Sequence, residues 1–380
     1  MHTVHRSRRT AALTFVLAAC LTAAGGIVPA TAVGAPSRDS APPGRAARPP
    51  SAGASAAGWL GRQFKPDGDL PESQGEPGIT YLPLAVVALA SAQVGRREIA
   101  RGIRYLELHF ASYVEVPASK SRSVPAPGRL AELILAAVAA GKNPRRFGGD
   151  KPANNLVARL LATQIKSGVD KGLFGSPGAP TYSSAYTQGL ALTALAAVGR
   201  ADAPGAAWLV AQQCPDGGWE SFRSGTKKCS APDPKTYTGP DTNDTALAIE
   251  GLVAAKVSPK VNPLAFLEAS QYSSGGFAYF GGHSSAQVPD PDSTAMVAQA
   301  LVALGKLAAV KRDGRGAEAG LAAFQLGCRA RPTERGAYRY PREAGANLYA
   351  TIQAIPAAMR EAFPIPPGPA SSSLPVLPCK

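Results

Sequence analysis

The segment from Pro204 to Leu252 decides the fold. It begins PGAAWLVAQQCPDGGWESF, through residue 222, and ends GPDTNDTALAIEGL from residue 239. The first part predicts a short helix carrying Trp208, followed by Gln213 and an Asp-Gly-Gly turn before Trp219. Two adjacent glycines supply the positive-φ residues that end a helix and reverse the chain. We therefore expect the second tryptophan to pack back on the helix end and a second helix to follow.

This pattern resembles the QW repeat of triterpene cyclases: an aromatic residue, an aliphatic one, three residues, a glutamine, a short spacer, a glycine, any residue and a tryptophan. Related repeats build the α/α toroids of protein prenyltransferase β subunits and, in looser form, of cobalamin carriers. The resemblance implies that the stretch from residue 239 begins an inner helix of such a toroid. In squalene-hopene cyclases this is the place of the acidic DxDD motif.

Similar two-helix units recur along the chain, and from Gln164 to Gln213 to Gln271 their spacing is about 50 to 60 residues. Helices buried between a ring and its centre should be apolar nearly all round, whereas outer helices should carry one apolar stripe. The sequence thus predicts an all-α fold, an (α/α)6 toroid of six outer and six inner helices, with an open solenoid as the alternative. The expected pairs, outer then inner, are the helix at Trp59 with 81–94, 97–111 with 129–140, 155–166 with 186–198, 204–213 with 241–252, 266–271 with 292–307, and 320–326 with 347–359.

The N-terminus reads as an export signal, with basic residues 5–9, an apolar run over 11–27 and Ala30-Thr31-Ala32 as the cleavage site. Lipidation at Cys20 is the alternative. The predicted organisation of this secreted protein is a signal peptide (1–32), a flexible Ala/Pro/Ser-rich linker (33–51), the toroid (52–363) and a Pro-rich tail (364–380).

The amino-acid composition limits the classes of binding partner that the chain is expected to have. The chain has 380 residues, 45% of them apolar, and a net charge of +14, which becomes 14 − 3 = +11 without the three arginines of the leader. Basic residues do not alternate with aromatics in any run, so no nucleic-acid partner is predicted. A basic surface suits adhesion to anionic cell-envelope polymers. After the leader, no stretch is apolar over the length that a membrane span needs.

Because the protein is expected to be exported, its cysteines are expected to form disulfides. Excluding the one in the leader, four remain, an even number for an oxidising compartment: Cys214, Cys229, Cys328 and Cys379. Three connectivities are possible; the local pairing of the first two is favoured, and the third could hold the tail through the fourth. A zinc site lacks CxxC spacing and nearby histidines. No metal and no cofactor are predicted.

Two acidic stretches, Asp241-Thr242-Asn243-Asp244 and Asp290-Pro291-Asp292-Ser293, align without gaps at the starts of two expected inner helices. Helix capping explains both, because Asp, Asn, Ser and Thr are preferred N-caps. The resemblance implies a second role, since the DxDD acid of class II terpene cyclases protonates an alkene or epoxide. Such an acid must stay protonated in apolar surroundings. Asn243 occupies the donor position, so the motif is degenerate.

Two functions follow from the residues and the resemblance. The first is a non-catalytic protein that binds a small, largely apolar or amphipathic ligand, or an envelope component, at the mouth of the toroid. The alternative is a terpenoid cyclase-like or polysaccharide-acting enzyme that uses carboxylates at the inner-helix N-termini. The candidate catalytic residues, for an enzyme, are Asp292, Asp290, Asp244 and Asp241. The candidate ligand-binding residues are Tyr81, Tyr182, Ser184, Tyr186, Asn243, Asp244, Asp292, Ser293 and Tyr349.

Overall fold

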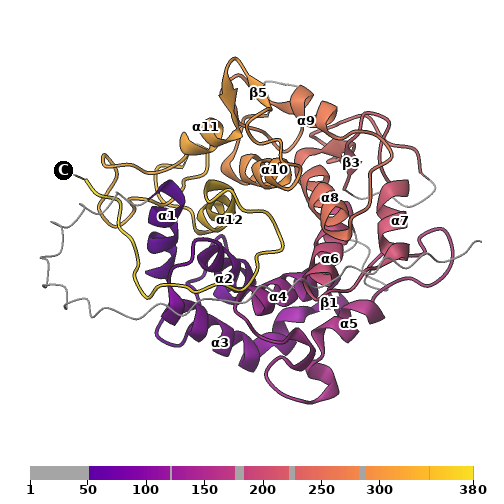
Figure 1. Ribbon diagram of the computed structural model, residues 1–380, viewed down its shortest axis with the longest axis horizontal. Coiled ribbons are helices and arrows are strands. Elements are labelled where there is room, and N and C mark those ends of the chain that lie inside the picture. The colour runs from indigo at the N-terminus through magenta and orange to yellow at the C-terminus, as the bar shows by residue number, and fades with distance from the viewer. Residues whose placement is uncertain are drawn as a thin grey trace, which may run out of the picture. The chain divides into compact units, whose positions relative to one another are not determined.

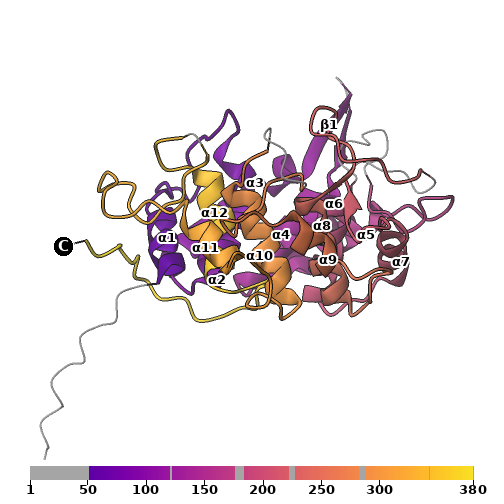
Figure 2. The ribbon, with the colours of Figure 1, turned by 90° about the horizontal axis from the view of Figure 1, so that it is seen from above.

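The computed structural model describes residues 51–119, 122–175, 184–221, 227–281, 287–341 and 343–379. Within these residues, twelve α-helices alternate along the chain between an outer and an inner ring (Figure 1; Figure 2). The predicted signal peptide and almost all of the predicted linker lie outside the described residues.

Six helices form the inner ring. Each contacts the next, and the last contacts the first, so the ring is closed. The predicted α/α toroid is confirmed, and the open solenoid is wrong. Glycine allows the closest approach, since a Cβ on Gly189 would lie 2.1 Å from the carbonyl oxygen of Leu247. The inner helices are α2 (Leu82–Ser91), α4 (Pro127–Ala139), α6 (Ala185–Ala197), α8 (Thr242–Ala255), α10 (Pro291–Ala303) and α12 (Leu348–Ala358).

The outer helices pack against the inner ring, and three of them are shorter than the sequence predicted. The helix expected over 155–166 covers only seven residues, because the chain turns at Thr163 so that Gln164 can bond to the following loop. The first outer helix packs against the last inner helix, which completes the outer ring. The outer helices are α1 (Ala52–Gly61), α3 (Arg96–Val114), α5 (Leu156–Ala162), α7 (Ala203–Ala211), α9 (Leu264–Ser270) and α11 (Ala317–Ala322).

The glutamines of the repeat have one structural role. In four units the amide Nε2 donates to a glycine carbonyl of the turn that follows the outer helix. The pairs are Gln164 with Gly172 at 3.3 Å, Gln213 with Gly217 at 2.9 Å, Gln271 with Gly275 at 3.0 Å and Gln325 with Gly336 at 3.0 Å.

Trp219 completes the best-preserved unit. Its side chain is fully buried, and its indole Nε1 donates to the carbonyl of Leu209 at 2.8 Å. Its backbone N–H donates to the hydroxyl of Thr245 at 2.9 Å. The tryptophan therefore joins the end of an outer helix to the next inner helix.

Short strands and 3-10 helices occupy the loops. The hairpin of β1 (Glu115–Ser119) and β2 (Arg122–Pro125) was not predicted. The two-residue strands are β3 (Trp219–Glu220) with β4 (Pro240–Asp241), and β5 (Lys311–Arg312) with β6 (Arg315–Gly316). The 3-10 helices are η1 (Gly78–Thr80), η2 (Pro144–Arg146) and η3 (Pro152–Asn154).

The proline-rich tail packs on the toroid. Arg96 donates from Nε to the carbonyl of Ala370 at 2.7 Å, and Ser371 donates its N–H to the carbonyl of Gln93 at 2.8 Å. The disulfide between Cys328 and Cys379 holds the end of the tail. Cys214 and Cys229 form the predicted local disulfide. None of the described helices is both long and apolar enough to cross a membrane.

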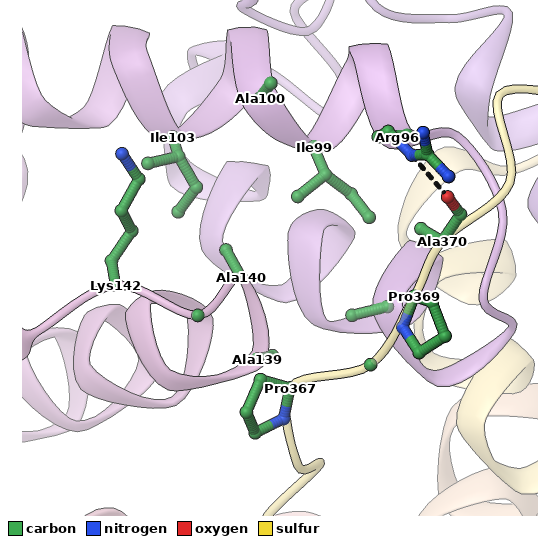
Figure 3. Close-up of a pocket in the computed structure, with 13 residues that line it drawn as sticks. Arg96, Ile99, Ala100, Ile103, Ala139, Ala140, Lys142, Pro367, Pro369 and Ala370 are labelled. Atoms are coloured by element: carbon green, nitrogen blue, oxygen red, sulfur yellow. Dashed lines mark hydrogen bonds between the residues drawn. The ribbon is translucent and has the colours of Figure 1, made fainter.

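A pocket of about 460 Å³ lies between α3, the C-terminal ends of α2 and α4, and this tail (Figure 3). Its walls are mainly alanine, isoleucine and proline, with Arg96 and Lys142 at the edge. The arginine is bonded to the tail, and Lys142 forms an ion pair with Glu107. The pocket lies at the opposite helix ends from the acidic stretches.

Candidate functional site

The second residue of α6, α8, α10 and α12 is a half-buried polar side chain, and α4 carries a half-buried acid at its sixth residue. Their neighbours in the same turns are mostly buried, so the accessible surface at this end of the ring is concentrated on these groups. They are Glu132, Tyr186, Asn243, Asp292 and Tyr349. Four of the five were predicted as site residues.

The start of α8 buries two carboxylates. Asp241 caps the helix and accepts the backbone N–H groups of Asn243 at 2.9 Å and Asp244 at 2.8 Å. Burial, and then the nearby carboxylate of Asp244, raise the pKa of Asp241 well above its ordinary value. Asp244 accepts the backbone N–H of Tyr186 at 2.7 Å, and burial raises its pKa to about 6. The second carboxylate therefore joins α8 to α6.

The start of α10 arranges its carboxylates differently. Asp290 accepts both the backbone N–H and the hydroxyl of Ser293 at 2.8 Å, so this pair caps the helix. Asp292 has a buried Oδ1 atom without a hydrogen-bond partner in the described part of the chain. Burial, followed by the charges of Asp290 and Glu343, raises the pKa of Asp292 well above its ordinary value. Burial therefore favours the neutral acid form of this side chain.

Phenols and a further acid connect the helix starts. The amide Nε2 of Gln353 donates to the hydroxyl of Tyr349 at 2.7 Å, and the ring of Tyr349 packs against that of Tyr81 at 5.7 Å. Glu132 accepts the hydroxyl of Tyr113, and burial raises its pKa to about 7. The cluster thus contains acids and phenols whose pKa values favour the neutral form.

Sequence reasoning missed three members of this cluster, namely Glu132, Tyr113 and Gln353. One signal was present, because Glu132 is the single acid in the apolar stretch RLAELILAAVAA. Gln353 follows Tyr349 by four residues and so lies on the same helix face. Both are polar residues at positions where an inner helix is otherwise apolar.

The remaining predicted residues have structural bonds. Ser184 caps α6 by accepting the backbone N–H of Thr187 at 3.1 Å. Tyr81 is buried and donates its hydroxyl to the carbonyl of Ser73 at 2.9 Å, so only its ring borders the cluster. Asn243 is half-buried and accepts the hydroxyl of Thr242 at 3.3 Å. Tyr182 lies outside the described residues.

One group of possible metal ligands occurs within the described ranges, formed by Cys214, Cys229 and Glu220. Both sulfurs belong to the disulfide, so neither is a thiolate. The carboxylate of Glu220 accepts the backbone N–H groups of Ser230 at 3.0 Å and Gly239 at 3.2 Å. These atoms are engaged in holding the loop.

Comparison with known proteins identifies the architecture. No family model matches the chain, and no curated protein matches it. Among solved structures, the apo type II terpene cyclase MstE from Scytonema is similar with a TM-score of 0.53 at 14% identity, over 81% of this chain and 96% of that one. A variant of MstE in complex with geranylgeranyl dihydroxybenzoate has a TM-score of 0.54 at 12% identity over the same shares. The chain therefore has the α/α-toroid fold that is seen in this terpene cyclase.

Proposed function

We propose that the protein binds a small, uncharged and largely apolar ligand at the first turns of the inner helices. Asp292, in its neutral acid form, makes a hydrogen bond to this ligand. The observation that carries the proposal is the buried Oδ1 atom of Asp292, which has no partner in the described part of the chain. A buried polar atom without a partner costs about 1 to 3 kcal/mol, and a ligand that supplies the partner recovers that free energy.

The chemistry of the cluster supports an uncharged ligand. Burial raises the pKa values of Asp292 and Asp241 and so favours their neutral forms, which suits an uncharged ligand better than a cation. The ring of Tyr349, which packs against the buried ring of Tyr81, offers apolar surface beside Asp292. A molecule with an apolar body and one hydroxyl or carbonyl group satisfies both surfaces.

We further propose that the protein acts outside the cell. Two disulfides support an oxidising compartment. The net charge of +14 supports additional loose adhesion to anionic envelope polymers.

Proton transfer is a second candidate function, and a specific observation favours it. Asp292 aligns with Asn243, the position at which the proton donor of a DxDD motif would stand, and burial raises its pKa, which favours the protonated form. In this reaction the acid proton moves to one carbon of an alkene, the neighbouring carbon becomes cationic, and Asp292 is left as a carboxylate. The cation then closes a ring and loses a proton to water, and water in turn reprotonates Asp292. The toroid fold shared with a type II terpene cyclase is compatible with such a substrate.

Incubation with farnesol, squalene, oxidosqualene and geranylgeranyl diphosphate distinguishes the two functions, with mass spectrometry of the native protein and of the extracted products. If the protein only binds its ligand, it should take up one of these compounds without changing it. The variant Asp292→Asn should retain uptake, since an amide still forms hydrogen bonds, whereas Asp292→Ala should weaken it by about 3- to 10-fold.

An enzyme would instead give a cyclised product, and Asp292→Asn would lower its rate by about 10²- to 10⁴-fold. The exposed acid Glu268 on α9 supplies the control, and Glu268→Gln should change neither readout. Absence of uptake and of product with all four compounds contradicts both functions for this ligand class.

A further inference from the structure

Three aromatic side chains, Tyr237, Tyr279 and Phe280, form an aromatic platform beside the two acidic helix starts. Tyr237 lies in the loop between β3 and β4, and its side chain is 62% exposed. Its ring lies 6.1 Å from the ring of Tyr279 and 6.1 Å from that of Phe280. Phe280 is buried and packs edge-on against Tyr279 at 4.8 Å. The platform thus has a buried base and an exposed outer ring.

Tyr237 is held in an unfavourable backbone conformation. Its φ of 54° lies in the left-handed region, which glycine and asparagine adopt more readily than a bulky residue. Asp233 fixes the loop by accepting the backbone N–H of Lys235 at 2.9 Å and the hydroxyl of Thr236 at 2.8 Å. Five other residues in the described ranges that are not glycine also have a positive φ, and Tyr237 differs from them in its exposed aromatic ring.

The platform is adjacent to the candidate site. The backbone N–H of Thr242, the first residue of α8, donates to the carbonyl of Tyr279 at 2.9 Å. Burial, and then the charges of Asp241 and Asp244, raise the pKa of Tyr279. Tyr340 interacts electrostatically both with Asp292 and with Tyr237. The exposed ring of Tyr237 accordingly lies near both acidic helix starts.

We infer that the aromatic platform is a second subsite of the same ligand, at which Tyr237 stacks on a flat ring. This inference rests on the proposed function and makes the ligand more specific. The ligand is an uncharged molecule with a hydroxyl or carbonyl group at Asp292, an apolar body and a planar ring at its other end. Tyrosine suits this role because its rigid side chain offers a large contact face at a small cost in conformational entropy.

Two probes that differ by one ring test the subsite: farnesol and 12-phenylfarnesol, which keeps the hydroxyl and carries the ring at the opposite end of the chain. Their dissociation constants are measured by calorimetry with the wild type, Tyr237→Asn and Lys256→Asn. Lys256 is a matched control, because it is exposed, has a φ of 58° and lies at the C-terminal end of α8, away from the acidic start. Asparagine tolerates the left-handed conformation in both variants, so neither should lower the melting temperature.

We expect the wild type and Lys256→Asn to bind the ring-bearing probe about 3- to 10-fold more tightly than farnesol. Tyr237→Asn should bind both probes equally. A preference for the ring-bearing probe that survives in Tyr237→Asn overturns the subsite, and so does equal binding of both probes by the wild type. A marked fall in the melting temperature of Tyr237→Asn assigns the ring to packing and also overturns it. If the wild type binds neither probe, the proposed function fails and the subsite with it.

Discussion

The starts of α8 and α10 have the same cap geometry and yet use their acids in opposite ways. In α8 the acids stand at the cap and at the third position after it, where Asp244 accepts the N–H of Tyr186. In α10 the acids stand at the cap and at the second position, where Asp292 has a buried atom without a partner in the described residues. In α8 the third position thus joins neighbouring inner helices, whereas in α10 it bonds back to the cap residue.

This difference indicates that a carboxylate at a helix start can bind a ligand only where it is not already used to cap a helix or to join two helices. Asp241, Asp244 and Asp290 all accept backbone hydrogen bonds that begin or join helices. Asp241 also has one buried oxygen without a partner, but its other oxygen caps α8, whereas Asp292 accepts no such bond within the described residues. Four predictions test whether residues that stabilise the fold can be distinguished from residues that bind a ligand.

The largest effect should come from the buried aromatic residue that precedes each of the two helices. Trp219→Ala and Phe277→Ala should each lower the free energy of unfolding by about 3 to 5 kcal/mol, because both side chains are fully buried. Urea denaturation measures the loss. Equal losses would establish that the two units are equivalent as scaffolds. A small loss in one unit with abolished ligand uptake would place that residue in the site instead.

Further along α8, Glu250 stands where the alignment puts Gln299 in α10. It accepts the N–H of Phe363 at 2.9 Å, and burial raises its pKa to about 8. The carboxyl group of Glu250 binds its proton more tightly in the folded state than in the unfolded chain. Protonation of Glu250 therefore stabilises the folded state, and this stabilisation is complete below about pH 4.5. It is lost as the pH rises to about 8, on the order of 4 kcal/mol in all.

The change Glu250→Gln makes α8 like α10 at this position and removes the titration. The variant should match the wild type at pH 5 and be more stable at pH 9 by a few kcal/mol, measured by urea denaturation. Other buried acids titrate equally in both proteins and cancel in the difference. Glu268→Gln, on the exposed face of α9, serves as the control. A stability difference that does not change with pH would contradict the role of Glu250.

A smaller effect is expected at the third position of each start. Asp244→Ala leaves the N–H of Tyr186 without its acceptor and should cost about 1 to 3 kcal/mol. Ser293→Ala removes only the hydroxyl bond to Asp290, which keeps its backbone bond, and should cost about 1 kcal/mol. Thermal denaturation of the two variants compares them. Equal costs would remove the distinction between the two third positions.

The smallest effect on stability should be that of Asp292→Asn. A neutral acid replaced by an amide of the same shape should change the free energy of unfolding by about 1 kcal/mol or less. Asp244→Asn should behave alike, since its amide oxygen can still accept the N–H of Tyr186. Stability curves at pH 7 provide the measurement. A loss above about 2 kcal/mol for Asp292→Asn would show that Asp292 is a structural residue.

The repeat could be predicted from sequence because its signals are local. The glutamine, glycine and aromatic residues of one unit stand within about ten positions of each other, and their bonds are formed within that unit or with the next. Helix lengths were less predictable. The seven residues of α5, for instance, end where Gln164 turns toward Gly172, which apolar periodicity does not reveal.

The candidate site was predictable only in part. Asp292 and Tyr349 stood at recognisable helix starts, but the missing partner of Asp292 is a property of the assembled ring. Glu132 and Gln353 join the cluster because α4 and α12 face the same centre. Tyr237 was missed because its neighbours Tyr279 and Phe280 are about 40 residues away, and no local pattern links them.

Closure of the ring has a consequence for how this protein can evolve. The indole of Trp59 donates to the carbonyl of Thr333 at 2.9 Å, and Gln325 donates to the carbonyl of Ala52 at 2.8 Å, so the first unit completes the last. An open array of repeats can gain or lose a unit, because each one contacts only its neighbours. Here a duplication or deletion of one unit breaks contacts between segments more than 270 residues apart. Diversity must therefore arise by substitution at the inner-helix starts and in the loops, while the number of units stays at six.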